Sequence, residues 1–407
     1  MATSKKLIVA IVLLGALIGF AALIFPLLGR PDHIHDYTET IQYSIKDDTA
    51  YYSQKCQHCD KYGPAKVLEN SIVVTPENVQ SVLDTNINGK TIVFGAYNFD
   101  NLLELRPSKS DSTTRIYAWT SDTTYDKTYA FALNELVKDD SFRYHYTRNI
   151  ENVTFAGVEG TSINNTFFVR SGETFADDQS AFNGGLIYDA VRGMDYMQAD
   201  QRGKHASHIS LTNITFQNLN FTGSNGLIYV DSTYQDSKVS TFAIKNCTFE
   251  TSTAQYHKAA IHLSCSQTGN IKDVVFENNT VSGHYQGIVI DNFKNAIIDN
   301  NKFSNITDNA IGIYGDVDQD NYFTGLIIVK NNSLESGTGR AIEFNKGSDA
   351  EIVVYSNYIA NFCNQNGEII QFVDLVGETK YSLVDNFYKS MAIENLFDKT
   401  DDYVVIF

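Results

Sequence analysis

A short sequence pattern typical of a β-strand repeats along the chain, and its outward-facing positions carry a line of side chains capable of acid–base and ionic chemistry. Imidazole, phenol and carboxylate groups transfer protons, while guanidinium and ammonium groups bind carboxylates. Because equivalent strands of stacked coils lie about 4.8 Å apart, such a line suits contact with one extended polymer. The alternative is an ordinary solvated strand face. The substrate-binding candidates are Asp291 and Asn345, and the catalytic candidates are His262, Tyr314, Arg340, Glu343 and Lys346.

An acidic loop follows one of these strands. Asp316, Asp318 and Asp320 alternate along it, and hard carboxylate oxygens at this spacing suit Ca²⁺. The loop differs from an EF-hand, because Asn321 replaces the turn glycine and Ile327 replaces the final glutamate. We therefore expect either a calcium site or an ordinary acidic loop at this position.

A repeat with a period of about 20–35 residues supplies the elements that position these side chains. Asparagine tolerates the left-handed backbone of tight turns, and stacked amides can form a hydrogen-bonded ladder. The 61-residue step from Asn152 to Asn213 leaves room for a second coil, with its strand at 165–169 or 185–188. We call the repeated turn position the turn column. It is occupied by Asn152, Asn213, Asn246, Asn278, Asn300 and Asn331, and in the last two coils by Ser356 and Asp385.

Short strand phrases without intervening helical patterns predict an all-β fold, a parallel β-helix solenoid over residues 71–395. A short capping helix is expected at 75–83, because an open solenoid end needs a cover and Thr75-Pro76 suits the start of a helix. Residues 396–407 would form a C-terminal tail or cap. Two aliphatic columns would fill the interior, Leu227, Ile261, Ile288, Ile311 and Ile342 beside Tyr229, Leu263, Ile290, Ile313 and Phe344.

The N-terminal segment is apolar over residues 7–29, the length of a transmembrane helix. Lys5 and Lys6 precede it, so the positive-inside rule leaves residues 1–6 as a cytoplasmic tail. We therefore expect a single-pass signal anchor in the membrane, with the C-terminal domain extracytoplasmic.

Residues 30–70 are polar and lack clear periodicity, which predicts a tether. The tether carries Cys56 and Cys59, whose Cys-x-x-Cys spacing is compatible with a disulfide, half of a zinc site or two free thiols. Three histidines lie nearby, His33, His35 and His58. The five side chains could ligate zinc together, or they could be separate surface residues.

The balance of charge is acidic, with 31 basic and 48 acidic residues and a formal net charge of −17. This excess argues against nucleic acid as a partner and against unaided binding of a polyanion. A divalent cation could still hold an anionic substrate against an acidic surface. The sequence does not specify the oligomeric state.

The repeat resembles the pectin-lyase-like superfamily of right-handed parallel β-helices, which contains polysaccharide lyases, hydrolases and epimerases. Residues 73–94 and 356–390 are similar to polysaccharide lyase family six, of the chondroitinase-B and alginate-lyase type. In that family a Glu-Ile-Ile stretch carries a calcium-binding glutamate, which Glu368 matches, and a catalytic Lys-Ser pair follows. Here Val373 and Asp374 occupy the positions of the pair, and no arginine-bearing strand is recognisable after them.

We therefore expect a protein that binds or processes a polysaccharide outside the cytoplasm, with Glu368 among the substrate-binding residues. Its enzymatic form would be a divergent uronate lyase or epimerase, in which a base abstracts the α-proton while a cation neutralises the carboxylate. The competing class is a non-catalytic surface carbohydrate-binding or adhesion protein.

Overall fold

The computed structural model describes residues 35–100, 103–105, 113–120, 123–129, 142–164, 167–169, 206–222, 228–232, 239–252, 254, 259–265, 271–315, 322–362 and 369–389. The chain divides into two compact units. The first is drawn from Met1–Gln42 and Tyr52–Lys66, and the second from Tyr43–Tyr51 and Val67–Phe407.

Parallel sheets dominate the second unit, and we number the three main ones I to III. The strands of sheet I are β4 (Ser71–Val74), β5 (Thr91–Phe94), β10 (Phe142–Gly157), β13 (Ala206–Gln217), β16 (Val239–Lys245), β19 (Ile271–Glu277), β22 (Phe293–Asp299), β25 (Phe323–Lys330), β28 (Gly347–Tyr355) and β31 (Lys380–Val384). Two further strands extend sheet I by antiparallel pairing, β8 (Thr113–Thr120) with β10 and β9 (Thr123–Tyr129) with β8.

Sheets II and III repeat the same order along the chain. Sheet II holds β6 (Asn98–Phe99), β11 (Ser162–Ile163), β14 (Asn220–Phe221), β17 (Thr248–Glu250), β20 (Thr280–Ser282), β23 (Lys302–Ile306), β26 (Ser333–Gly337), β29 (Tyr358–Phe362) and β32 (Phe387–Lys389). Sheet III holds β15 (Ile228–Ser232), β18 (Ala259–Cys265), β21 (Gln286–Asp291), β24 (Ile311–Tyr314), β27 (Ile342–Asn345) and β30 (Ile370–Val373).

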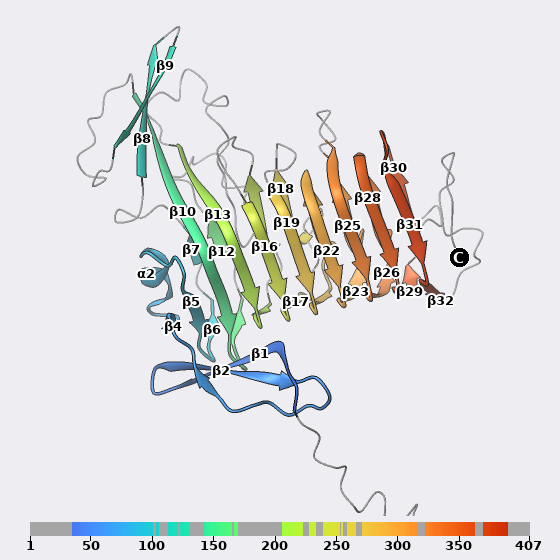
Figure 1. The fold of residues 1–407 in the computed structure, drawn as a ribbon, viewed down its shortest axis with the longest axis horizontal. Coiled ribbons are helices and arrows are strands. Elements are labelled where there is room, and N and C mark those ends of the chain that lie inside the picture. Colours follow the sequence, from blue (N-terminus) through green and yellow to red (C-terminus); the bar gives the residue numbers. More distant parts are fainter. Residues whose placement is uncertain are drawn as a thin grey trace, which may run out of the picture. The chain divides into compact units, whose positions relative to one another are not determined.

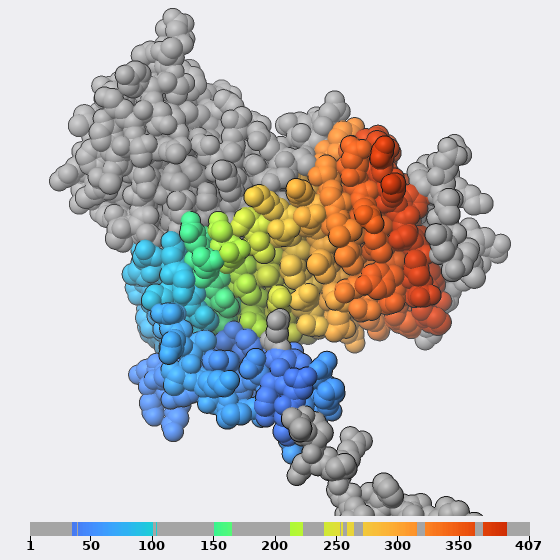
Figure 2. Space-filling model, viewed as in Figure 1, coloured from blue at the N-terminus to red at the C-terminus, as the bar shows by residue number. Residues whose placement is uncertain are grey.

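From β13 to β30 each coil contributes one strand to each sheet, and each strand pairs in parallel with its equivalent one coil later. The strands of sheet I from β10 to β31 lie side by side in Figure 1, and the coils form successive colour bands in Figure 2. Parallel pairing between equivalent strands is the definition of a parallel β-helix, so this part of the predicted fold is confirmed.

Stacked apolar side chains fill the inside of the coils. On sheet III, Ile261, Ile288, Ile311 and Ile342 are paired in register and fully buried. Aromatic rings stack between coils elsewhere in the core, for example Phe221 on Phe249 with ring centroids 4.9 Å apart. Burial of one such large side chain contributes about 1.5–3 kcal/mol, so these columns dominate the stability of the coils.

The predicted interior columns are wrong at one coil. The backbone register pairs Ile228 with Ile261 and Val230 with Leu263, so Tyr229 is one residue out of line with its predicted column, and Leu227 lies outside the described residues. Since side chains alternate along a strand, a slip of one residue exchanges the two faces. Consecutive apolar residues in 227–230 fit either register, which is why the sequence pattern did not decide between them.

The predicted turn column is confirmed. All six asparagines, together with Ser356 and Asp385, have backbone φ between 51° and 58°. This left-handed region is unfavourable for most side chains, and asparagine is among the few that tolerate it. The amide of Asn300 donates to Asn278 Oδ1 at 2.7 Å, and that of Asn213 donates to Asn152 Oδ1 at 2.8 Å.

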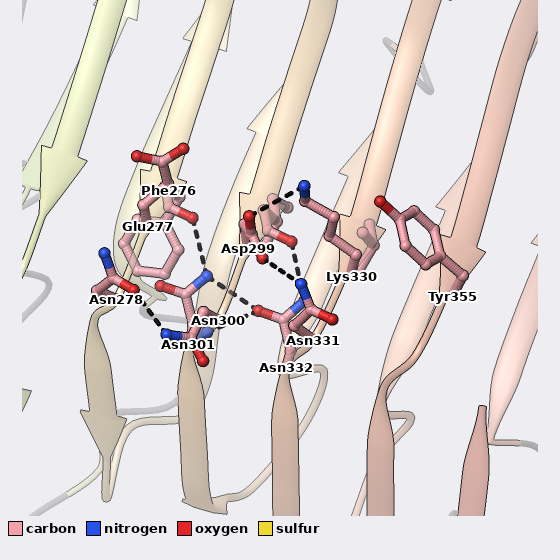
Figure 3. A network of polar contacts seen from close by, with 12 residues as sticks. Phe276, Glu277, Asn278, Asp299, Asn300, Asn301, Lys330, Asn331, Asn332 and Tyr355 are labelled. Carbon is pink, nitrogen blue, oxygen red and sulfur yellow. Dashed lines mark hydrogen bonds and ion pairs between the residues drawn. The ribbon is translucent and has the colours of Figure 1, made fainter. Parts of the chain in front are cut away.

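The continuous ladder belongs to a different column, one residue later: Asn279, Asn301, Asn332, Asn357 and Asn386. Asn301 Oδ1 accepts from the backbone N–H and the side-chain amide of Asn279, at 2.8 and 3.1 Å. Asn301 Nδ2 in turn donates to Phe276 O at 2.8 Å and to Asn332 Oδ1 at 3.0 Å, as Figure 3 shows. The sequence suggested the first asparagine of each pair because that residue occupies the turn; the second one is buried and carries the ladder.

The 61-residue step proves to be one coil. Residues of β10 pair directly with β13, and the Asn213 amide reaches Asn152 without an intervening coil. The strand expected near 165–169 exists as β12 (Phe167–Val169), which pairs with β7 (Leu103–Leu105) as a further part of the coil. Residues 185–188 lie outside the described residues.

A short helix precedes β5. It is α2 (Val79–Leu83), within the range 75–83 predicted to be helical, and it buries Val79 and Leu83. The N-cap residue Asn78 makes no side-chain cap hydrogen bond, but its Oδ1 accepts from the Thr75 N–H at 2.7 Å.

Regular structure also occurs where an irregular tether was predicted. Three strands form a separate sheet between residues 37 and 67: β1 (Tyr37–Lys46), β2 (Thr49–Cys56) and β3 (Lys66–Val67). The expectation of no regular structure here was wrong, because polar strands lack the strict apolar alternation used to find them. Among the described residues no helix is long and apolar enough to cross a membrane, and the anchor predicted at 7–29 lies outside them.

Candidate functional site

The outer face of sheet III carries two rows of residues in register. One row runs from His262 through Val289, Gly312 and Glu343 to Gln371, and the other runs from Asp291 through Tyr314 and Asn345 to Val373. Because alternate residues of a strand share a face, the two rows lie on the same side of the sheet. The strands therefore place the predicted residues His262, Asp291, Tyr314, Glu343 and Asn345 on one face.

The first polar contact on this face joins adjacent strands diagonally. His262 Nε2 on β18 lies 2.7 Å from Asp291 Oδ2 on β21. Val289, directly opposite His262, is apolar, so the imidazole finds its polar partner two residues further along β21. The His262 and Asp291 side chains are 28% and 19% exposed, so the pair is accessible to a ligand yet shielded enough for its charge to matter. A carboxylate in this position orients the imidazole.

Tyr314 lies over the backbone of its own strand. Gly312 makes this possible, since a Cβ at that position would lie 2.5 Å from the Tyr314 hydroxyl. The hydroxyl accepts from Asn309 Nδ2 at 2.7 Å and lies 3.5 Å from Glu343 Oε2. Burial, and then the nearby carboxylate of Glu343, raises the pKa of Tyr314 well above its ordinary value. The phenol therefore stays protonated at neutral pH and cannot act as a base there.

Glu343 is the centre of the second polar cluster. Its Oε2 atom accepts from Asn309 Nδ2 at 2.6 Å and from the Arg340 guanidinium at 3.2 Å. The side chain of Glu343 is 12% exposed, and that of Arg340 is 25% exposed. Burial of a carboxylate is unfavourable unless charged or amide donors form hydrogen bonds with it, as they do here. Tyr314, Asn309, Arg340 and Glu343 together form one connected group.

Asn309 is a central residue that the sequence analysis missed. It is 3% exposed, and its Oδ1 accepts from the Arg340 backbone N–H at 3.3 Å. The strand register places Asn309 level with Gln286 one coil earlier and Arg340 one coil later, each directly before the small residue that opens the strand phrase. That repeated polar position was a usable signal.

Three carboxylates and one guanidinium set the charge of this face. Asp308 adds to the carboxylates of Asp291 and Glu343, and its Oδ2 accepts from Gln286 Nε2 at 3.0 Å. Arg340, which already pairs with Glu343, is the single cation among these groups apart from a protonated His262. The face is therefore rich in hydrogen-bond donors and acceptors without being basic.

Two predicted residues stand apart from this group. Lys346 lies in the turn after β27 with φ of 60°, and its ammonium is 5.9 Å from the centroid of the Tyr322 ring. Asn345 follows Tyr314 in its row, and its Oδ1 atom is buried without a hydrogen-bond partner among the described residues.

The remaining site predictions lie outside the described residues. These are Glu368 and the calcium candidates Asp316, Asp318 and Asp320. These residues stay predictions.

Comparison with known proteins supports the architecture. A family model described as "Right handed beta helix region" matches residues 203–386. Over these residues the chain is similar to right-handed β-helices, in agreement with the parallel sheets. The match concerns the fold, and the resemblance to polysaccharide lyase family six stays a prediction.

Two further comparisons complete the picture. The chain is similar to the crystal structure of PfbA, a surface adhesin of Streptococcus pneumoniae, with 12% sequence identity, a TM-score of 0.27, and coverage of 77% of this chain and 86% of that chain. No curated protein matches the sequence.

Proposed function

We propose that this chain is a membrane-anchored, extracytoplasmic β-helix protein that binds a polysaccharide along the outer face of sheet III. The observation that carries the proposal is the polar line across four successive strands, from His262 and Asp291 to Tyr314, Glu343 and Arg340. In this proposal the apolar segment 7–29 is the anchor and α2 covers the open end of the solenoid.

The spacing and chemistry of the line suit a sugar polymer. Neighbouring strands lie about 4.8 Å apart, so an extended chain running across them would meet a new set of polar groups at each coil. The carboxylates of Asp291 and Glu343 accept hydrogen bonds from hydroxyls, while the partly exposed guanidinium of Arg340 donates them. Sugar hydroxyls both donate and accept, so they match this mixture.

The charge of the face favours a polymer of low negative charge. Asp291, Asp308 and Glu343 would repel a polyanion, and Arg340 already pairs with Glu343. A uronate polymer would need a divalent cation between it and these carboxylates. Ca²⁺ bound by Asp316, Asp318 and Asp320, with Glu368 as a substrate-binding residue, is our proposal for that case.

A uronate lyase or epimerase is the second candidate, and the contact between His262 and Asp291 favours it. With Nε2 held by Asp291, the Nδ1 atom of a neutral His262 would take the α-proton. The protonated phenol of Tyr314 would give a proton to the leaving oxygen as the carbon–oxygen bond breaks and the double bond forms. Arg340 would neutralise the substrate carboxylate.

Glycan-array binding followed by titration of the retained polymers tests the proposal. We expect the wild-type chain to retain at least one polysaccharide, and Tyr314→Phe to weaken that binding about tenfold, because one donor is lost. Tyr355→Phe, on the outer side of sheet I, is the matched control and should bind like the wild type. Equal affinity for both variants, or no retained polysaccharide, would remove sheet III as the binding face.

An absorbance assay for the unsaturated product separates the two candidates. Alginate, chondroitin and pectin are incubated with the chain, with and without Ca²⁺. Product formation that His262→Ala abolishes would establish the lyase, whereas binding without product from any uronate polymer supports the non-catalytic protein.

A further inference from the structure

The first unit brings together three side chains of types that bind metal ions, and none of them belongs to the candidate site on sheet III. His35 lies two residues before β1, Cys56 is the last residue of β2, and Cys59 lies in the turn that follows. The side-chain atoms Nδ1 of His35 and Sγ of both cysteines all lie within 4.8 Å of one another. We propose that His35, Cys56 and Cys59 bind one zinc ion.

Local backbone structure explains why these residues converge. Gln57 N donates to Asp36 O at 2.7 Å, and the Thr38 hydroxyl donates to Lys55 O at 3.0 Å. In an antiparallel pair of strands the residue number rises along one strand as it falls along the other, so paired residues keep a constant sum. The two contacts have the same sum and therefore fit one antiparallel register between β1 and β2. That register places the start of β1 beside the end of β2, and thus His35 beside Cys56.

The Cys-x-x-Cys segment is itself closed by a tight turn. Cys56 N donates to Lys61 O at 2.8 Å, and Lys55 pairs with Tyr62 in an antiparallel bridge. The chain therefore reverses between the two cysteines and directs both sulfur atoms to the same side. An ion pair of 2.8 Å between Lys55 and Asp60 spans the turn.

The distances match tetrahedral zinc. His35 Nδ1 is 3.4 Å from Cys56 Sγ and 3.6 Å from Cys59 Sγ. Zinc bonds of about 2.05 Å to nitrogen and 2.3 Å to sulfur at a tetrahedral angle separate those ligand atoms by about 3.6 Å. A small movement of the side chains would complete the geometry.

The donor set selects the metal. Two thiolates and an imidazole suit zinc far better than calcium or magnesium, which prefer oxygen ligands. The cysteines are not joined as a disulfide, and Cys56 is 3% exposed while Cys59 and His35 are half-buried. Three protein ligands leave a fourth position, which we assign to a water molecule. The ion would clamp the open end of the β1–β2 hairpin.

Zinc and cobalt titration of the full-length chain, purified with its thiols reduced, tests the site. We expect one zinc per chain by elemental analysis and, with Co²⁺, the charge-transfer absorption of a cobalt–thiolate bond. Cys56→Ser and Cys59→Ser should each weaken zinc binding more than about 100-fold, because loss of a ligand exceeds the 10–100-fold loss for an outer-shell partner. His35→Ala should weaken it similarly and keep the cobalt–thiolate band.

His58→Ala is the matched control, since His58 lies exposed between the two cysteines. It should bind one zinc with wild-type affinity. Zinc binding that survives in Cys56→Ser, that is lost in His58→Ala, or that is absent from the reduced chain would overturn the assignment. So would thiol counting that finds Cys56 and Cys59 oxidised to each other in the protein isolated without reductant. Circular dichroism of each variant separates loss of a ligand from loss of the fold.

Discussion

Two columns of polar side chains run along this β-helix, and they differ in kind. The buried asparagine ladder repeats the same residue in successive coils, and each member makes the same contacts with the next. The polar line on sheet III changes at every coil, from imidazole to carboxylate, phenol and guanidinium. Repetition with satisfied hydrogen bonds indicates a structural role, whereas variation on an accessible face indicates recognition.

Burial strengthens this distinction. The ladder side chains are at most 2% exposed at Asn279, Asn301, Asn332 and Asn357. Each of these side chains donates a hydrogen bond to a backbone carbonyl. The ladder ends at Cys247, whose N–H donates to Asn279 Oδ1 at 2.8 Å. Burial raises the pKa of the Cys247 thiol to about 12, so this cysteine is an inert core residue. On sheet III, by contrast, His262 and Arg340 keep about a quarter of their side chains exposed.

The largest effect should follow from a break in the ladder. Asn301→Leu removes the acceptor of the buried Asn279 backbone N–H and the side-chain donor to the Phe276 carbonyl, while the Asn279 side-chain amide keeps its bond to Ile244 O. Each buried unsatisfied group costs about 1–3 kcal/mol, so the free energy of unfolding should fall by about 3 kcal/mol or more. Urea unfolding measures this loss.

Asn300→Gly is the control for that variant. Asn300 occupies the exposed turn column with φ of 53°, which glycine adopts readily, and it makes one side-chain bond to Asn278. We expect a loss of no more than about 1 kcal/mol. An equal loss for the two variants would show that the ladder has no special structural role.

A buried imidazole makes the core sensitive to acid. His284 is 2% exposed, its Nε2 has no partner among the described residues, and burial lowers its pKa to about 4. Between pH 6.5 and 4 the unfolded chain binds a proton that the folded chain does not, so stability falls as the pH falls. The full effect is about 3 kcal/mol.

Unfolding free energies at pH 7 and pH 4.5 measure the contribution of His284. His284→Asn should flatten the pH dependence, whereas His58→Asn, which removes an exposed imidazole, should leave it unchanged. If the unfolding free energy of His284→Asn falls between pH 7 and pH 4.5 as much as that of the wild type, another group causes the acid sensitivity.

A smaller effect on stability, with a clear effect on binding, is expected for Gly312→Ala. The added methyl group would lie 2.5 Å from the Tyr314 hydroxyl and would displace the ring from Asn309 and Glu343. Strain of this kind costs about 1–3 kcal/mol, toward the lower end where a side chain can move aside. Polysaccharide affinity should fall at least as much as in Tyr314→Phe. Unchanged affinity would mean that the position of Tyr314 is unimportant.

Periodic features of this fold were predictable from the sequence, and single registers were not. The turn column from Asn152 to Asp385 was identified because asparagine recurs where the backbone must be left-handed. The register near Ile228 was missed because consecutive apolar residues satisfy both faces. The tether at 30–70 was misjudged because its strands β1 and β2 are polar.

The candidate site was predictable in its face but not in its contacts. Alternation along each strand correctly grouped His262, Tyr314 and Glu343 on one side of sheet III. It could not show that Asn309 bridges Tyr314 and Glu343, because Asn309 lies before β24, where no alternation applies. Lys346 was grouped with them by sequence distance, yet the turn after β27 directs it to Tyr322.

The most direct test of sheet III as the recognition face is a paired measurement on Glu343→Gln and Glu277→Gln. Both residues are carboxylates in ion pairs, Glu343 with Arg340 on sheet III and Glu277 with Lys245 on sheet I. We predict that Glu343→Gln weakens polysaccharide binding at least tenfold while the free energy of unfolding changes by no more than about 2 kcal/mol. Glu277→Gln should change neither quantity appreciably. Equal binding by both variants would contradict the assignment of sheet III as the recognition face.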